Sequence, residues 1–272
     1  GNRLLMDVDM SGGFDASRKF RPAWLENPFY VDVASVWTLT KADLNLDTTR
    51  YATFAGDNVA LSSGSYDYGS YLDDGLDTIL VTASSGLSLT GEIVFDDSTA
   101  SEGKTRVVLM SGGGIESDSG TTLSHALSDL VLTARDDVNL SGATLSAGRR
   151  LEILGQRDLS ITDGQLEAGE SIRLQAAKNL NLNSIQFSQG LPSLYLQATT
   201  VNLRNLNFPN GSSVNINSLK GGFDGKYPNF GSQAFGRVNF IEKVKYGDNL
   251  MNDRPSFDLH GKNVTIGKMP QP

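Results

Sequence analysis

Apolar and polar residues alternate in short segments along the chain, and between about residues 130 and 217 these segments recur every 21 residues, give or take one. Two columns of the repeat are apolar pairs: Leu130/Leu132, Leu151/Ile153, Ile172/Leu174, Leu194/Leu196 and Val214/Ile216, then Val138/Leu140, Leu159/Ile161, Leu180/Leu182 and Val201/Leu203. Two further columns are single residues: Leu145, Leu166, Phe187 and Phe208, then Gly148, Gly169, Gly190 and Gly211. Because four columns share one period, the chain contains an internal structural repeat.

Alternation with a period of two predicts short strands with one buried face, and the i, i+3, i+4 spacing of a helical solenoid is missing. Three such segments fit into each repeat, so the chain turns three times per coil. Stacking the coils about 4.8 Å apart pairs equivalent strands in parallel. We therefore predict an all-β fold, a single-stranded right-handed parallel β-helix (β-solenoid) of about 21 residues per coil, with loop insertions and a C-terminal cap.

The repeat indicates a single β-helix domain over residues 1–272. Residues 1–77 are predicted to form irregular N-terminal coils and an insertion, 78–217 regular coils, and 218–272 C-terminal coils or a cap. Outside the regular coils, apolar alternation predicts further strands in five segments: Tyr30–Val33, Ala42–Leu46, Asn58–Leu61, Val238–Val244 and Phe257–Ile266.

The outward positions of the predicted coils form three rows: Val131, Glu152, Arg173, Tyr195 and Asn215; Asn139, Ser160, Asn181 and Asn202; and Thr144, Gln165, Gln186 and Asn207. In the first row, Glu152 and Arg173 are expected one rung apart as a cross-strand ion pair. The other two rows are uncharged polar ladders, which suit a solvated surface or hydrogen bonding to sugars.

Two phrases within the repeat carry a resemblance to a known family. Leu145-Ser-Ala-Gly148 and Leu166-Glu-Ala-Gly169 carry the first, and Arg157-Asp-Leu-Ser-Ile161 and Lys178-Asn-Leu-Asn-Leu182 the second. The run that contains them resembles the haemagglutinin-type repeats of filamentous bacterial adhesins. The resemblance implies a β-helical shaft that is exported across the bacterial envelope and works in adhesion or surface assembly, at the cell surface or secreted. The Asn-Pro-Asn-Gly motif of two-partner secretion domains is missing near the start, so the secretion route stays open.

Composition narrows the function classes. The chain of 272 residues has a net charge of −8 and no cysteine. The lack of cysteine excludes disulfides, thiolate catalysis and thiolate zinc sites. The acidic balance argues against nucleic acid or an anionic membrane as the partner, and no apolar run reaches the ~18 residues that span a bilayer. The expected partners are a host or environmental glycan or protein, together with end-to-end self-association of the solenoid.

Catalytic signals are weak. Enzymes that resemble pectate lyases and polygalacturonases share this fold class, and a glycosidase needs two carboxylates over one groove. The chain has acidic doublets at Asp73-Asp74, Asp96-Asp97 and Asp136-Asp137, which we interpret as solvated turn acids. The two histidines, His125 and His260, lie in separate segments without metal-site spacing. We therefore predict no catalytic residue, no metal site and no cofactor.

Aromatic loops are the best binding candidates in the sequence. Tyr66, Tyr68 and Tyr71 lie beside Asp73 and Asp74 in the insertion at 62–77. Aromatic faces next to hydrogen-bond acceptors are typical of sugar and protein contacts. A second, weaker candidate is the Gly- and Phe-rich stretch after the repeat, with Phe223, Tyr227, Phe230 and Phe235.

The sequence thus favours a non-enzymatic β-helical segment of a bacterial surface or secreted adhesin or autotransporter-like protein, a rigid shaft that presents loops. The alternatives are a carbohydrate-active enzyme (a polysaccharide lyase or glycoside hydrolase) on the same fold and a self-associating structural module.

Overall fold

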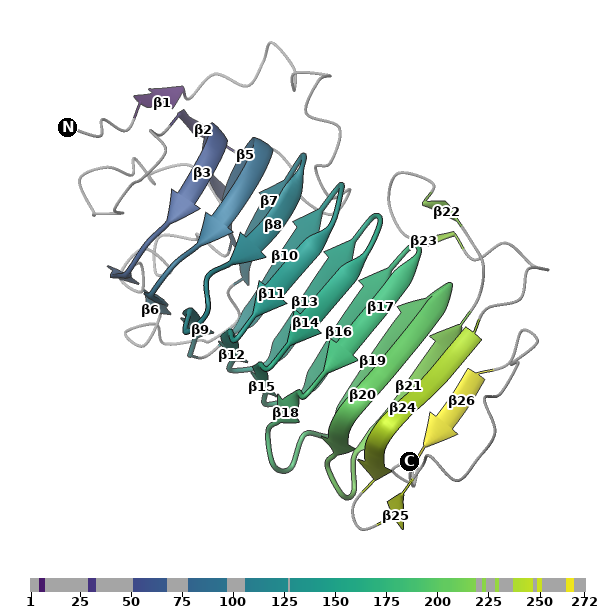
Figure 1. The fold of residues 1–272 in the computed structure, drawn as a ribbon. Coiled ribbons are helices and arrows are strands. Elements are labelled where there is room, and N and C mark those ends of the chain that lie inside the picture. The colour runs from purple at the N-terminus through teal and green to yellow at the C-terminus, as the bar shows by residue number, and fades with distance from the viewer. Residues whose placement is uncertain are drawn as a thin grey trace.

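The computed structural model describes residues 5–7, 29–32, 51–67, 78–96, 106–126, 128–218, 222–223, 228–229, 237–246, 249–250 and 263–266. All regular secondary structure in these ranges is β-strand (Figure 1). The strands of successive coils lie side by side in the order of the sequence, so that the chain advances along one axis as it winds (Figure 1).

Three parallel ladders make up the stack. The first ladder contains β7 (Arg106–Ser111), β10 (Asp129–Ala134), β13 (Arg150–Gly155), β16 (Ser171–Ala176), β19 (Ser193–Ala198) and β21 (Ser213–Ser218). The second contains β8 (Gly114–Ser117), β11 (Val138–Ser141), β14 (Leu159–Thr162), β17 (Asn179–Asn183), β20 (Thr200–Phe208) and β24 (Arg237–Tyr246). The third contains β4 (Gly64–Asp67), β6 (Glu92–Asp96), β9 (Thr122–His125), β12 (Thr144–Ala147), β15 (Gln165–Ala168) and β18 (Gln186–Phe187).

Two long strands join the first and second ladders near the N-terminal end. β3 (Tyr51–Leu61) pairs along its length with β5 (Thr78–Leu89), and β5 pairs in parallel with both β7 and β8. The predicted strand at Asn58–Leu61 is therefore the end of a longer one, and the predicted segment Val238–Val244 lies within β24, a further parallel coil. The segment Ala42–Leu46 lies outside the described residues.

The register confirms the predicted period. Leu130 pairs with Leu151, Val138 with Leu159 and Leu145 with Leu166, so each repeat step becomes one rung of a ladder. The prediction of an all-β parallel solenoid is confirmed.

One continuous hydrophobic core lies between the ladders. It takes residues from all three, including Leu132, Leu140 and Leu145, each 2% exposed or less. On the third side, the rings of Phe187 and Phe208 are stacked with their centroids 6.0 Å apart. Since a full apolar side chain contributes about 1.5–3 kcal/mol on burial, these columns hold the stack together.

Two corners of the coil fix the backbone in different ways. At the predicted glycine column, a Cβ on Gly169 would lie 2.3 Å from the carbonyl oxygen of Gly148, whereas Gly190 and Gly211 have φ of 77° and 86°. A second corner also has positive φ, at Gly142 and then at three residues that carry side chains: Asp163, Ser184 and Asn205, with φ of 51°, 55° and 47°. Asp and Asn tolerate this region better than most residues, which accounts for polar residues at this corner.

The motif Arg157-Asp-Leu-Ser-Ile161, which carries part of the family resemblance, has a structural role. The Oδ1 atom of Asp137 accepts a hydrogen bond from the backbone N–H of Asp158 at 3.1 Å. One coil later, Oδ1 of Asp158 accepts from the backbone N–H and the side-chain amide of Asn179, at 3.1 and 3.0 Å. Asp137 and Asp158, which directly precede β11 and β14, thus each tie their coil to the next one.

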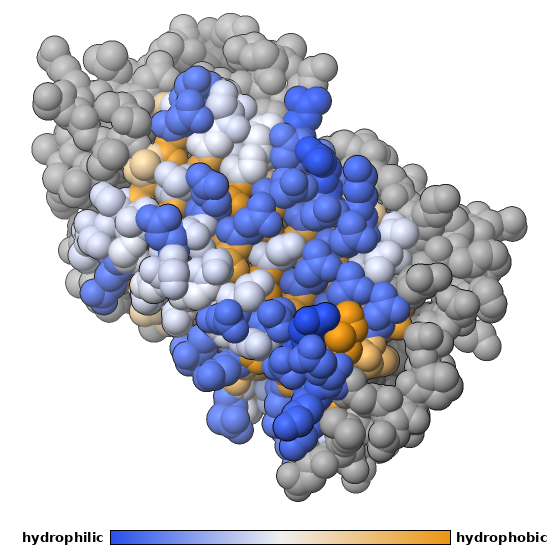
Figure 2. Space-filling view, viewed as in Figure 1, coloured by the Kyte–Doolittle hydropathy of each residue, from blue (hydrophilic) through white to orange (hydrophobic). Residues whose placement is uncertain are grey.

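An uncharged ladder runs along the outside of the second ladder, as predicted. Asn181 donates to Ser160 at 3.1 Å, Asn202 donates to Asn181 at 2.7 Å, and Asn239 continues the row by donating to Asn202 at 2.7 Å. Hydrophilic residues cover much of the face shown in Figure 2, with hydrophobic residues visible between them.

We expect Asn202→Ala to lower the free energy of unfolding by about 1–2 kcal/mol, because the change removes one donor and one acceptor from the ladder. Denaturant titration would measure this loss. Asn207→Ala, at an exposed position of the same strand, is the matched control and should change stability by less than about 0.5 kcal/mol. Equal losses in both variants would contradict the ladder's contribution.

The outward row of the first ladder differs from the prediction in two places. Val131 is only 5% exposed, because it belongs to a second apolar cluster with Leu80, Val108 and Met110 on the outward side of the strands. Glu152 and Arg173 are in register, but the expected ion pair is wrong: Arg173 instead lies over the ring of Tyr195, 5.0 Å from its centroid. A guanidinium gains cation–π attraction on an aromatic ring, and this contact takes the place of the pair.

Antiparallel strands lie at both ends of the described part of the first ladder. At the N-terminal end, β2 (Phe29–Asp32) pairs in parallel with β3, and β1 (Leu5–Asp7) pairs antiparallel with β2. At the C-terminal end, β26 (Asn263–Ile266) pairs antiparallel with β21, as β25 (Asn249–Leu250) does with β24. A separate antiparallel pair joins β22 (Gly222–Phe223) and β23 (Pro228–Asn229).

Candidate functional site

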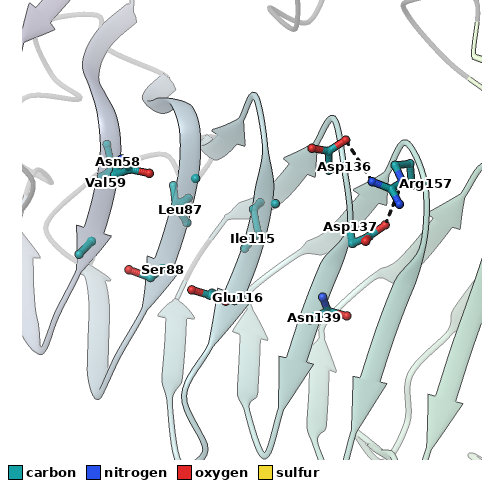
Figure 3. Close-up of a pocket in the computed structure, with 13 residues that line it drawn as sticks. Asn58, Val59, Leu87, Ser88, Ile115, Glu116, Asp136, Asp137, Asn139 and Arg157 are labelled. Atoms are coloured by element: carbon teal, nitrogen blue, oxygen red, sulfur yellow. Dashed lines mark ion pairs between the residues drawn. The ribbon is translucent and has the colours of Figure 1, made fainter.

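A trough of about 560 Å³ lies on the outer side of the second ladder, where β3, β5, β8 and β11 run next to one another (Figure 3). Its lining residues belong to β3, β5, β8 and β11 and to the corners before β11 and β14: Asn58, Val59, Ala60, Gly86, Leu87, Ser88, Gly114, Ile115, Glu116, Asp136, Asp137, Asn139 and Arg157.

The trough exists because one outward column loses its side chains on two neighbouring rungs. Asn58 pairs with Gly86, and Gly86 pairs with Gly114. On the next coil the column reaches Asp137, whose carbonyl oxygen accepts from the N–H of Ile115 at 3.0 Å. The two glycines leave a bare backbone floor between the side chains of Asn58 and Asp137.

The parallel outward column, two residues further along each strand, forms one wall. It reads Ala60, Ser88, Glu116 and Asn139, in register across the four strands. Small residues stand on β3 and β5, and longer polar ones on β8 and β11. Within the described residues, the exposed carboxylate of Glu116 has no hydrogen-bond or ion-pair partner.

The opposite corner of the trough carries a charged group of three residues. Arg157 Nη1 lies 3.7 Å from Asp136 Oδ1, and Arg157 Nε lies 3.6 Å from Asp137 Oδ1 (Figure 3). Asp137 is also the acceptor for the backbone of Asp158. The two aspartates, interpreted from the sequence as solvated turn acids, are half-buried and paired with one guanidinium.

Other corners carry exposed carboxylates that are held by hydrogen bonds. The hydroxyls of Ser84 and Ser85 donate to Asp57 Oδ1 at 2.6 and 2.5 Å, and these hydrogen bonds hold the pKa of Asp57 below its ordinary value. Further along the stack, Arg149 and Arg150 each donate to Glu170 at 3.1 Å and lower its pKa. Both carboxylates therefore stay ionised at neutral pH, and their hydrogen bonds join neighbouring coils.

Chemically, the trough offers hydroxyl, amide, carboxylate and guanidinium groups around a floor without side chains. Such a set binds hydroxyl-rich molecules by multiple hydrogen bonds. Among the residues that the structure describes, no group of three His, Asp or Glu side chains could hold a metal ion.

The site predicted from the sequence is largely outside the described residues. The backbone of Tyr66 lies in β4 and pairs with Phe95 of β6, but Tyr68, Tyr71, Asp73 and Asp74 fall in the range that is not described. The tyrosine-rich loop therefore stays a prediction. Of the Phe-rich stretch, only Phe223 is described, in β22.

The histidine in the described part of the chain is a core residue. His125 is fully buried in the third ladder, and its Nδ1 lies 3.0 Å from the carbonyl oxygen of Asp129. His260 lies outside the described residues.

Sequence reasoning missed the trough, although a signal was present. Aligned on the strand pattern, Gly86-Leu-Ser-Leu89 and Gly114-Ile-Glu-Ser117 take the place of Asp137-Val-Asn-Leu140. Two glycines on the outward column of successive rungs, where later coils carry Asp or Asn, would have pointed to a hollow.

None of the described residues belongs to a helix long and apolar enough to cross a membrane. Comparison of the chain with protein-family models, with curated proteins and with solved structures gave no match.

Proposed function

We propose that the chain is a non-enzymatic β-helical segment of a bacterial surface or secreted adhesin or autotransporter-like protein. The observation that carries the proposal is the parallel stack, in which the first and second ladders pair strand to strand from β3 to β21 and β24 around a single core, with register shifts between Gly56 and Asn58 and between Arg204 and Leu206. Each rung extends such a stack by about 4.8 Å without a hinge, so the architecture suits a rigid spacer that holds binding surfaces away from a cell.

The resemblance of the repeat to haemagglutinin-type repeats supports the same proposal. The tie from Asp158 to the backbone of Asn179 gives the shared phrase a role in building the coil. Because this motif stabilises the stack of coils, it supports the function of a shaft. Ligand specificity then depends on the outward residues.

A carbohydrate-active enzyme is the second candidate, and one observation favours it. Glu116, Asp136 and Asp137 line the same trough, which is the kind of clustering that carboxylate chemistry on sugars requires. Against it, Asp136 and Asp137 share one guanidinium, so that Glu116 is the carboxylate of the three without an ion pair among the described residues. The trough therefore does not offer two unpaired carboxylates that could act as a separate acid and base.

Beads coated with the purified chain test the proposed function. We expect them to adhere to glycan-coated surfaces several-fold above beads coated with albumin, with no shortening of soluble polysaccharides in a parallel reducing-end assay. A variant with Tyr66, Tyr68 and Tyr71 changed to Ala shows whether the tyrosine-rich loop contributes. Release of new reducing ends or unsaturated products would overturn the non-enzymatic function, and adhesion no greater than that of albumin would overturn the adhesin.

A further inference from the structure

Gly86 occupies a position where the fold does not require glycine. Its φ lies outside the left-handed region, and an added Cβ would make only an ordinary contact, 3.4 Å from Oδ1 of Asn58. Gly114 is tighter, since its Cβ would lie 3.0 Å from the carbonyl oxygen of Asp137. A glycine within a strand weakens the strand relative to alanine and often marks a place where a ligand approaches the backbone.

We infer that the trough over Gly86 and Gly114 is a binding site for a glycan chain whose sugars are uncharged or carry amino groups. The inference rests on the proposed function in one respect: the ligand is an extracellular glycan. It places the ligand on the solenoid wall, on residues from β3, β5, β8 and β11, and not in the tyrosine-rich loop.

The lining favours a glycan over a protein partner. The large apolar side chains of the trough, Val59, Leu87 and Ile115, are 1–2% exposed, and Ala60 adds only one methyl group, so they offer little surface to a large apolar anchor. Protein interfaces take most of their binding energy from large side chains that bury apolar surface, and no large apolar side chain of the lining is accessible. The accessible lining includes hydroxyl, carboxylate and amide groups on successive rungs, at Ser88, Glu116 and Asn139, which suits a polymer of hydroxyl-bearing units.

The charges of the trough select among glycans. Its lining holds three carboxylates, on Glu116, Asp136 and Asp137, against one guanidinium, on Arg157. The chain as a whole carries a net charge of −8, which adds to the negative field. Uronate and sulfate groups are therefore repelled, whereas hydroxyls can donate to the free Glu116 carboxylate and ammonium groups can pair with it.

Calorimetric titration with three tetrasaccharides tests the inference on the purified full chain. The probes are tetramers of N-acetylglucosamine, of glucosamine and of galacturonate, which are neutral, cationic and anionic. We expect binding of the first or second probe at least tenfold tighter than binding of the third. Equal or tighter binding of the galacturonate tetramer, or no binding of any probe at millimolar concentration, would overturn the inference.

Gly86→Ala is the decisive variant, because folding and binding should respond in opposite directions. The new methyl fills the floor of the trough and should weaken binding at least tenfold, while the melting temperature stays equal or rises. Gln186→Ala removes an exposed polar side chain from the third ladder, outside the trough, and should leave binding unchanged. Unchanged binding in Gly86→Ala would overturn the site.

Glu116→Gln tests the charge argument separately. It should weaken binding of the glucosamine tetramer several-fold more than binding of the N-acetylglucosamine tetramer, and equal effects would overturn the role of the carboxylate. The failures of the two proposals remain distinguishable. Cleavage of a bound tetrasaccharide contradicts the non-enzymatic function and leaves the trough as a site, whereas adhesion without any effect of Gly86→Ala contradicts the trough alone.

Discussion

Leu182→Asp is expected to unfold the solenoid. Leu182 is 1% exposed in the core, in register between Ile161 and Leu203 of the neighbouring coils. A carboxylate there has no partner and no water, so the expected loss is about 4 kcal/mol or more, a large fraction of the stability of a typical domain. Circular dichroism during heating and in denaturant measures it.

The neighbouring position provides the control for this experiment. Asn183 points to the other side of β17, is half-buried, and lies in register with Arg204. Asn183→Asp keeps the oxygen that accepts a hydrogen bond from Ser184 and places the new charge outside the core. It should change stability by less than about 1 kcal/mol. If the two variants melt alike, the assignment of inward and outward positions is wrong.

Removal of a whole coil should be tolerated far better than removal of one strand. Deleting residues 150–170 takes out β13, β14 and β15 together, and the strands β16, β17 and β18 can then pair with β10, β11 and β12 in the same register. Since the stability of a repeat stack is roughly a sum over coils and their interfaces, we expect one cooperative transition with a melting temperature lower by several degrees.

The matched deletion removes residues 150–156, which are β13 and the start of its turn. This change breaks the three-strand cycle, so that each later strand meets the wrong ladder. We expect loss of the cooperative transition in calorimetry. Similar melting of the two deletion variants would show that the 21-residue coil is not the structural unit.

The repeat was predictable because several independent sets of residues recur with the same 21-residue period. Leu130, Val138 and Leu145 each recur at the same step, and every such step became a rung. A column of hydrophobic residues reports burial directly, since a one-residue slip would move the whole set to the solvent side. Register and core therefore follow from the pattern alone.

The trough and the outward contacts were harder to predict. The trough depends on side chains that are absent, and the contacts depend on which of two neighbours a side chain pairs with. Gly86 is informative only after its rung has been placed beside Gly114. Arg173 had two neighbours of suitable chemistry, and its preference for Tyr195 over Glu152 depends on side-chain conformations that no spacing encodes. The corner with positive φ at Asp163 and Asn205 contains no hydrophobic residue, so the alternation of apolar and polar positions does not reveal it.

The antiparallel strands at the two ends of the first ladder bear on polymerisation. A parallel stack that ended in a bare coil would offer its edge as a template for an identical coil from another molecule, as the end of an amyloid fibril does. Here β1 and β26 run against the direction of the strands that they cover, and each is short. An incoming parallel coil would meet a reversed hydrogen-bond pattern, and short edge strands are a common protection against such pairing. We therefore expect β1 and β26 to oppose templated pairing of a parallel coil along the first ladder, which argues against the end-to-end self-association expected from the sequence.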